Sequence, residues 1–241
     1  MDVRRRIASR SLLACVAAPW VRAASAAESV KVGILHSLSG TMAISESILK
    51  DVMLMLIHEQ NRKGGLLGRQ IEPVIVDPAS DWPRFAERAR HLLHEERAAA
   101  VFGCWTSVSR KSVLPVFEAL DGLLFYPVQW EGEESSRSIF YTGATPNQQA
   151  IPAVEYLKID MGIERWALVG TDYVYPRTTN RILAAWLGTQ GVAPQDVMTV
   201  YTPFGHDDWR SIVRDIKAFG STGRRTAVIS TVNGDANVAF Y

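Results

Sequence analysis

The chain has 241 residues, of which 47% are hydrophobic and 21% are charged, and its formal net charge at pH 7 is +1. This apolar content is enough for one large or two small globular domains and argues against a disordered chain. Basic and acidic residues are interspersed, so the charge pattern argues against binding to nucleic acid or to an acidic membrane surface.

The first thirty residues are typical of an export signal. Arginines at positions 4, 5, 6 and 10 precede an apolar stretch from Ser11 to Val21, and "AASAAE" allows cleavage near Ala26 or Ala27. The stretch is too short to span a bilayer, so we predict a periplasmic protein without stable membrane insertion. The export route stays open, because "RRRIA" also resembles a twin-arginine signal and "LLAC" a lipoprotein box that would anchor Cys15.

Short β-branched runs alternate with longer stretches of helical period after the signal. Strands are predicted at Val30–Leu35, Ile71–Val76, Ala99–Phe102 and Leu123–Tyr126, and helices at Ile44–Asn61, Pro83–Glu96 and Ser109–Leu120. Asp81 is placed to begin the second of these helices. Strands and helices in this order predict parallel pairing through right-handed crossovers. We therefore expect a doubly wound α/β lobe over residues 28–144.

The same alternation begins again after Tyr141. Helices are predicted at Gln148–Met161, Arg177–Gln190 and Asp208–Phe219, and strands at Trp166–Val169, Val197–Tyr201 and Ala227–Thr231. Pro146 marks the predicted crossing between lobes, which gives a signal peptide over 1–27, a first lobe over 28–144 and a second α/β lobe over 145–241. A lobe with three clear strands would leave apolar faces uncovered, so we expect an incomplete second lobe and a truncated reading frame or a fragment.

Five turns that follow predicted strands are rich in polar and aromatic side chains. They read "HSLSGT", "CWTSVS", "YPVQWE", "GTDYVYP" and "NGDAN". In open α/β sheets, ligands bind in the crevice beyond the carboxyl ends of the strands. We therefore expect the functional site to be built from these turns.

Covalent catalysis is poorly supported by the residues of the second turn. Ser107 has no glycine two residues away on either side, as a nucleophile elbow requires, although a base distant in the sequence stays open. Cys104 lacks a catalytic signature, and after signal cleavage it has no cysteine to pair with, so we expect a small buried residue.

His91 and His94 lack zinc-protease spacing, and dinucleotide and P-loop motifs are missing, so neither metal nor cofactor is predicted.

A binding role explains more of these residues. The Thr106–Ser109 turn precedes a helix, so its hydroxyls and free N–H groups can meet an acceptor oxygen or simply cap the helix. Asn233 and Asp235 can accept ligand N–H groups, although turn formation or capping competes for Asp235. Five aromatic residues can form flat walls with polar tips or pack in the core: Trp105, Tyr126, Trp130, Tyr173 and Tyr175.

Six segments carry a resemblance to a known family: "VKVGILHSLSGTMAISE", "VFGCWTSVSRKSVLPVFE", "LLFYPVQWEGEESS", "IFYTGATPNQQ", "VGTDYVYPRTTNRI" and "STVNGDANVAF". They closely resemble type I periplasmic binding proteins, specifically the urea-binding component of ABC uptake systems, and they occur in family order from Val30 to Tyr241. The resemblance implies two α/β lobes that close on a ligand and deliver it to an ABC permease. Family members continue beyond this length, which agrees with the expected truncation.

The resemblance also implies a set of ligand-binding residues. Those of the first lobe are Trp105, Thr106, Ser107, Tyr126 and Gln129, and those of the second are Tyr173, Tyr175, Asn233 and Asp235. Urea has one acceptor oxygen and four N–H donors. Ser107 and neighbouring N–H groups suit the oxygen, while Asp235, Gln129 and backbone carbonyls suit the N–H groups.

Two other classes of function stay open. A neighbouring branch of the family binds short-chain amides and includes a cytoplasmic amide sensor, against which the export signal argues. The remaining class is an enzyme that hydrolyses an amide through Cys104 or Ser107. The sequence does not separate urea from acetamide or formamide as the ligand.

Overall fold

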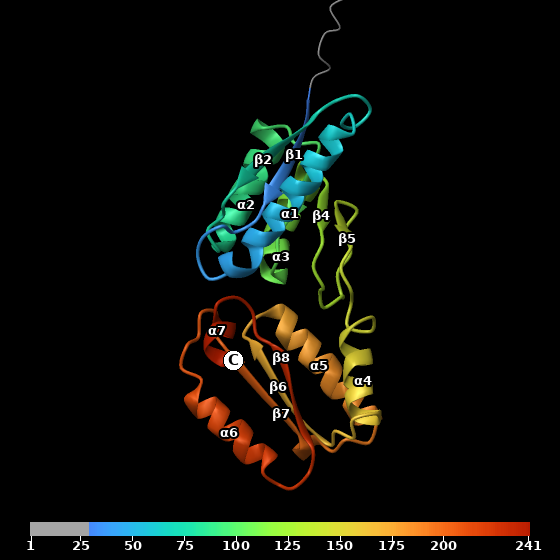
Figure 1. Ribbon diagram of the computed structural model, residues 1–241, viewed down its shortest axis with the longest axis vertical. Coiled ribbons are helices and arrows are strands. Elements are labelled where there is room, and N and C mark those ends of the chain that lie inside the picture. Colours follow the sequence, from blue (N-terminus) through green and yellow to red (C-terminus); the bar gives the residue numbers. More distant parts are fainter. Residues whose placement is uncertain (1–28) are drawn as a thin grey trace, which may run out of the picture.

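The computed structural model describes residues 29–241, and the predicted signal peptide with Cys15 lies outside the described residues. The described chain forms two α/β halves stacked along the long axis of the molecule (Figure 1). Each half contains a parallel sheet with helices beside it, as predicted.

The first half is built on a five-stranded parallel sheet in the order β2-β1-β3-β4-β5. Its strands are β1 (Val30–Leu35), β2 (Ile71–Val76), β3 (Ala100–Gly103), β4 (Leu124–Tyr126) and β5 (Ile139–Tyr141). Its helices are α1 (Ala43–Arg62), α2 (Trp82–Arg90), the π-helical turn η1 (His91–Glu95) and α3 (Ser107–Ala119). The main core lies where α2 and α3 cover the sheet, and its fully buried side chains include Phe85, Leu92, Val101, Phe117 and Leu124.

Most predicted elements of this half are present, with two differences. The predicted helix from Pro83 to Glu96 changes to π-helical hydrogen bonding after Arg90, although Asp81 begins it as predicted by accepting the Arg84 N–H at 2.8 Å. Strand β5 was not predicted. It has three residues, too few to show a period, and it is positioned by parallel pairing with β4 and by the stacking of Phe140 on Phe125 at 4.7 Å.

The second half is built on a three-stranded parallel sheet in the order β7-β6-β8. Its elements are α4 (Ala150–Ile159), β6 (Arg165–Thr171), α5 (Val174–Thr189), the 3-10 turn η2 (Pro194–Asp196), β7 (Val197–Thr202), α6 (Arg210–Gly220), β8 (Thr226–Thr231) and α7 (Ala236–Phe240). Every helix and strand predicted in this half is present. Helix α5 begins three residues earlier than predicted, and the boundary between residues 144 and 145 stays a prediction.

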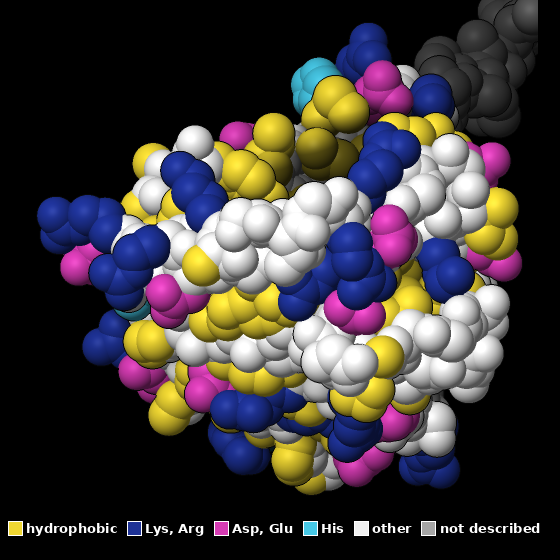
Figure 2. All heavy atoms as spheres, turned by 90° about the horizontal axis from the view of Figure 1, so that it is seen from below, with side chains coloured by type: hydrophobic (Ala, Val, Ile, Leu, Met, Phe, Trp, Pro, Cys, Tyr) yellow, Lys and Arg dark blue, Asp and Glu magenta, His cyan; other side chains and the backbone are white. Residues whose placement is uncertain are grey.

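Two separate apolar clusters hold the second half together. One includes Trp166, Leu168, Leu183 and Leu187 and joins the sheet to α4 and α5, and the other surrounds the buried Trp209 at the start of α6. Seen from the end of the molecule that this half forms, basic and acidic side chains are mixed over the surface with apolar ones between them (Figure 2). None of the helices in residues 29–241 combines the length and apolar character that crossing a membrane requires.

The two sheets present their carboxyl ends to each other. The turn after β1 contacts the turn after β8, where the Asp235 N–H donates to the Thr41 carbonyl at 3.1 Å. Trp82 of the first half contacts Phe204, which follows β7, with ring centroids 5.3 Å apart. The polar turns of both halves therefore face a shared crevice, where the strand-end rule predicts a site.

Candidate ligand-binding site between the two halves

A nearly closed cavity lies between the halves, with about 10 Å³ of space for the centre of a water-sized sphere. Its lining residues lie at or shortly after the carboxyl ends of β3, β4, β6 and β8, and they are Trp105, Ser107, Tyr126, Val128, Gln129, Tyr173, Tyr175 and Asn233. Seven of the nine residues predicted to bind ligand are in this set, and their role in binding stays a prediction. Val128 is the lining residue that was not predicted.

Thr106 and Asp235 are not among the residues that line the cavity. Thr106 is buried and caps α3, because its Oγ1 accepts the Ser109 N–H at 3.1 Å and donates to the Ser109 Oγ at 3.0 Å. Asp235 is exposed and lies just before α7, after Gly234, which adopts a φ of 74°. The structure therefore shows the competing capping role for Thr106 and does not bring the Asp235 carboxylate to the cavity.

Trp130 also has a packing role. Its ring is 8% exposed and stacks on Tyr141 with centroids 4.1 Å apart. The Arg110 guanidinium lies over the Trp130 ring, 5.1 Å from its centroid, and over the Tyr126 ring, 4.9 Å from its centroid. The tryptophan therefore supports the cavity wall from behind and does not form part of its surface.

Ser107 belongs to a closed network of three buried side chains. Its hydroxyl donates to Glu131 Oε2 at 2.5 Å and accepts from Arg110 Nη1 at 3.0 Å. Arg110 Nη2 donates to Glu131 Oε1 at 2.9 Å. Because a serine hydroxyl has one proton, this network leaves Ser107 an acceptor toward the cavity, the reverse of the donor role expected from the sequence.

Glu134 completes the neutralisation of Arg110. The Arg110 Nε donates to Glu134 Oε1 at 2.9 Å, and Lys111 Nζ and the Tyr141 hydroxyl donate to the same carboxylate. Burial alone would raise the pKa of Glu134, but these hydrogen bonds outweigh it and hold the pKa at about 2. Two carboxylates thus compensate the charges of Arg110 and Lys111, and the arginine has no free positive charge to offer a ligand.

Arg110, Glu131 and Glu134 are not among the site residues predicted from the sequence. The sequence did contain one signal for this pairing, which is complementary charge. The basic segment "SRK" lies in the helix after the second polar turn, and the acidic segment "EGEE" lies at the end of the third polar turn. Pairing across 21 to 24 residues depends on β3 and β4 being adjacent in the sheet. That adjacency is a property of the fold and is not visible in either segment alone.

The tyrosines of the cavity are neutral phenols. Burial raises the pKa of Tyr126, Tyr173 and Tyr175 above the ordinary value for tyrosine. The Tyr126 hydroxyl donates to the Trp105 carbonyl at 2.8 Å, which ties the end of β4 to the turn after β3. These groups can donate and accept hydrogen bonds, and they bring no charge into the cavity.

The geometry around Cys104 and Ser107 lacks the parts of a nucleophilic site. Cys104 is fully buried, and burial raises the pKa of its thiol, which disfavours the reactive thiolate. In the described part of the chain, Ser107 hydrogen-bonds to a carboxylate and a guanidinium and contacts no histidine base. His36, the histidine that follows β1, instead lies 3.2 Å from the buried Glu46.

The residues that the structure describes include no group of three or more His, Cys, Asp or Glu side chains that could hold a metal ion. His91 and His94 lie at the end of the α2 region, where His91 Nδ1 is 3.0 Å from Glu95 Oε2. His91 is half-buried and His94 is exposed, and His91 contacts a neighbouring carboxylate in place of a second metal-ligating side chain.

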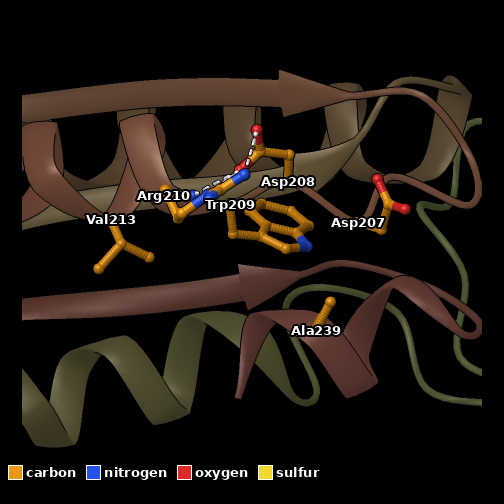
Figure 3. A pocket seen from close by; sticks show the side chains of 6 residues that line it. All are labelled: Asp207, Asp208, Trp209, Arg210, Val213 and Ala239. Atoms are coloured by element: carbon orange, nitrogen blue, oxygen red, sulfur yellow. Dashed lines mark hydrogen bonds and ion pairs between the residues drawn. The ribbon is translucent and has the colours of Figure 1, made fainter.

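A second and larger hollow lies between the start of α6 and α7 (Figure 3). It has a volume of about 560 Å³, and its charged groups Asp208 and Arg210 pair with each other at 2.9 Å. The Trp209 indole beside them is buried and donates to the His206 carbonyl at 3.1 Å. We take the smaller cavity as the candidate site, because buried polar groups from both halves converge there.

The chain is similar to known proteins in its sequence. Residues 30–241 match the family model described as "Periplasmic binding protein domain". Among curated relatives, the leucine-, isoleucine-, valine-, threonine-, and alanine-binding protein of Pseudomonas aeruginosa is 27% identical over 152 residues, which is 62% of this chain and 40% of the relative. The Leu/Ile/Val-binding protein homolog 7 of Brucella melitensis is 32% identical over 111 residues, which is 43% of this chain and 28% of the relative.

Solved structures show the same fold at low identity. A solute-binding protein of an ABC transporter from Rhodopseudomonas palustris, in complex with p-hydroxybenzoic acid, has a TM-score of 0.75 at 20% identity and covers 88% of this chain and 56% of that one. The branched-chain amino acid transporter substrate-binding protein LivJ from Streptococcus pneumoniae, in complex with isoleucine, has a TM-score of 0.69 at 17% identity and covers 83% and 56%. The chain therefore spans less than two thirds of the length of these relatives.

Proposed function

The chain belongs to the periplasmic binding protein family, and on this premise we propose that it is an extracytoplasmic solute-binding protein that captures urea between its two halves and delivers it to an ABC permease. The observation that carries the proposal is the cavity itself, which is small, aromatic and lined by eight uncharged side chains. Short-chain amides, which share the planar carbonyl and N–H groups of urea, are the alternative ligands.

The size of the cavity favours a ligand of few atoms. A cavity needs roughly 10 to 15 Å³ of space for the centre of a water-sized sphere to hold one water molecule, so the cavity of about 10 Å³ has room for about one in the closed arrangement of the halves. Urea and acetamide, with four heavy atoms each, therefore require the cavity to widen. Leucine, with nine heavy atoms, requires a larger separation of the halves than these amides do.

The absence of charge on the cavity lining favours a neutral ligand. An amino acid brings a carboxylate and an ammonium group, and burial of each requires an opposite charge or several hydrogen bonds. None of the eight described lining residues is charged, and the nearby Arg110 and Glu131 pair with each other at 2.9 Å. A neutral amide avoids this cost, whereas a zwitterion does not.

The hydrogen-bonding groups of the cavity match those of urea. Ser107 Oγ is available as an acceptor, and so is Asn233 Oδ1, because the Asn233 amide nitrogen already donates to the Thr231 carbonyl at 2.9 Å. Thr106 caps the Ser109 N–H, but the Ser107 N–H at the start of α3 has no partner within its own helix, and with the Tyr173 hydroxyl it suits the urea oxygen. Trp105 and Tyr175 supply flat faces for a planar molecule.

Calorimetric titration of the full protein, as its gene encodes it, tests this proposal. Urea, acetamide, formamide and leucine are titrated separately. We expect saturable binding of urea or a short amide and at least about a hundredfold weaker binding of leucine, since a buried unpaired polar group costs roughly 1 to 3 kcal/mol and leucine would bury two charges. Tight binding of leucine with no heat from the amides would contradict the proposal and would favour the ligand named for the Pseudomonas relative.

A further inference from the structure

We infer that Glu131 is a positioning residue that turns Ser107 into a hydrogen-bond acceptor, so that the site takes ligands with N–H groups and rejects carboxylates of the same shape. This inference rests on the proposed function, since it concerns how the proposed amide site distinguishes acetamide from acetate. Glu131 acts through Ser107, because it is not one of the residues that line the cavity.

The hydrogen bonds of the network assign every proton. Arginine has donors only, so the 3.0 Å contact from Arg110 Nη1 occupies one acceptor position of Ser107 Oγ. A carboxylate has acceptors only, so the 2.5 Å contact with Glu131 Oε2 uses the single Ser107 proton. The Tyr126 hydroxyl also lies beside Ser107, but its own proton goes to the Trp105 carbonyl at 2.8 Å, so it donates none to the serine. One acceptor position of the Ser107 hydroxyl remains, and Ser107 is one of the residues that line the cavity.

The network resists rearrangement because it is buried and paired on all sides. Arg110 is 0% exposed, Ser107 1% and Glu131 2%. Glu134 accepts from the Arg110 Nε, and the rings of Tyr126 and Trp130 lie beside the guanidinium. Rotating the Ser107 proton toward the cavity would leave a buried carboxylate oxygen without its donor, which a low-dielectric site penalises.

This fixed polarity discriminates between two ligands of the same shape. The NH₂ group of acetamide can donate to Ser107, whereas either oxygen of acetate would place a lone pair against the serine lone pair. A site built to hydrogen-bond a particular group can reject an analogue that lacks it by a factor of about 10⁴. Glu131 therefore determines specificity through the direction of one serine proton.

The variant Glu131→Gln tests the inference directly. Its side-chain amide can donate to Ser107 Oγ and still accept from Arg110, which frees the serine proton to point into the cavity. We expect acetamide affinity to fall about tenfold or more and the acetamide-to-acetate preference to fall about a hundredfold, both measured by calorimetry at pH 7. The matched control is Glu133→Gln, which removes the same charge from an exposed residue of the same loop that does not contact Ser107.

A double-mutant cycle with Ser107→Ala separates positioning from simple charge removal. If Glu131 acts through the serine, Glu131→Gln has no further effect on the preference once Ser107 is alanine. An effect that persists unchanged in the Ser107→Ala background, or a preference that Glu131→Gln alone shifts less than about threefold, would overturn the inference.

Two measurements decide the question even if Glu131→Gln does not fold. In the unmodified protein, acetate must bind at least about a thousandfold more weakly than acetamide, and Ser107→Ala must weaken acetamide about tenfold without strengthening acetate. Failure of either result overturns the inference while urea binding leaves the proposed function standing. An unmodified protein that binds none of the amides overturns both.

Discussion

The two sides of the cavity differ in how their polar groups are supported. On the first half, Ser107 is held by a buried network of opposite charges that includes Arg110, Glu131 and Glu134. On the second half, the support is neutral: the Asn233 N–H donates to Thr171 Oγ1 at 2.9 Å, and Tyr173 packs on Phe204 with centroids 4.9 Å apart. We therefore expect the first side to determine which ligand groups are accepted and the second side mainly to supply closing contacts.

The largest expected effect is on the stability of the first half. Arg110→Met leaves Glu131 and Glu134 buried without their cation, and breaking a buried ion pair costs about 3 to 5 kcal/mol. Guanidinium chloride unfolding measures this free energy without adding the proposed ligand urea. The control Arg181→Met removes an exposed arginine and should stay within about 0.5 kcal/mol of the parent. Equal losses in the two variants would remove the distinction between the two sides.

A substitution on the second side should affect binding more than folding. Tyr175→Ala removes a half-buried aromatic wall of the cavity, and the lost burial corresponds to about a tenfold to hundredfold weaker affinity for urea. Calorimetry gives the affinity, and thermal unfolding gives the stability. A melting temperature reduced as much as in Arg110→Met, with binding unchanged, would contradict the proposed role of this side.

Acidification should weaken the first side selectively. The folded pKa of Glu134 is about 2, below the ordinary value for glutamate, so its contribution to stability is present above the unfolded pKa of about 4.3 and is lost as the pH falls toward 2. We expect the free energy of unfolding to decrease over this interval and the decrease to be shallower in Glu134→Gln. Unfolding at a series of pH values measures both slopes, and identical slopes would show that Glu134 is not held as an anion.

The smallest expected effect concerns Cys104, which lies under the first side. Because the thiol is fully buried, a thiol reagent should label it only as the protein unfolds, and Cys104→Ala should change urea affinity by less than about twofold. Labelling rates and titrations of the variant check these outcomes. Rapid labelling of the native protein, or ammonia released from urea and lost in Cys104→Ala, would revive the amide-hydrolysing alternative.

The parts of the fold that the sequence predicted are those with a strong local pattern. Strands β1 and β2 have their predicted bounds, because each is a short run rich in Val and Ile that ends at a polar turn. Seven of the nine predicted ligand-binding residues meet at one cavity, because the carboxyl ends of parallel strands converge. Strand β5, with three residues, depends on pairing with β4 and has no comparable local signal.

The parts that could not be predicted depend on contacts distant in the sequence. The direction of the Ser107 proton is determined by Glu131, which is 24 residues away along the chain. The position of Asp235 after a strand predicted that it accepts hydrogen bonds from the ligand. In the structure the Asp235 side chain is exposed, next to Gly234 with its positive φ. The residue types therefore predicted where the cavity forms. Which of its groups donate and which accept hydrogen bonds could be determined only from the packed structure.

The most direct test of the central claim is a crystal structure of the full protein grown with urea. We predict planar density in the cavity, stacked against Trp105 and Tyr175, with an N–H group within hydrogen-bond distance of Ser107 Oγ. An amino acid retained there from the expression host, or an unchanged cavity with urea bound elsewhere, would contradict the proposal that this site selects a small neutral amide.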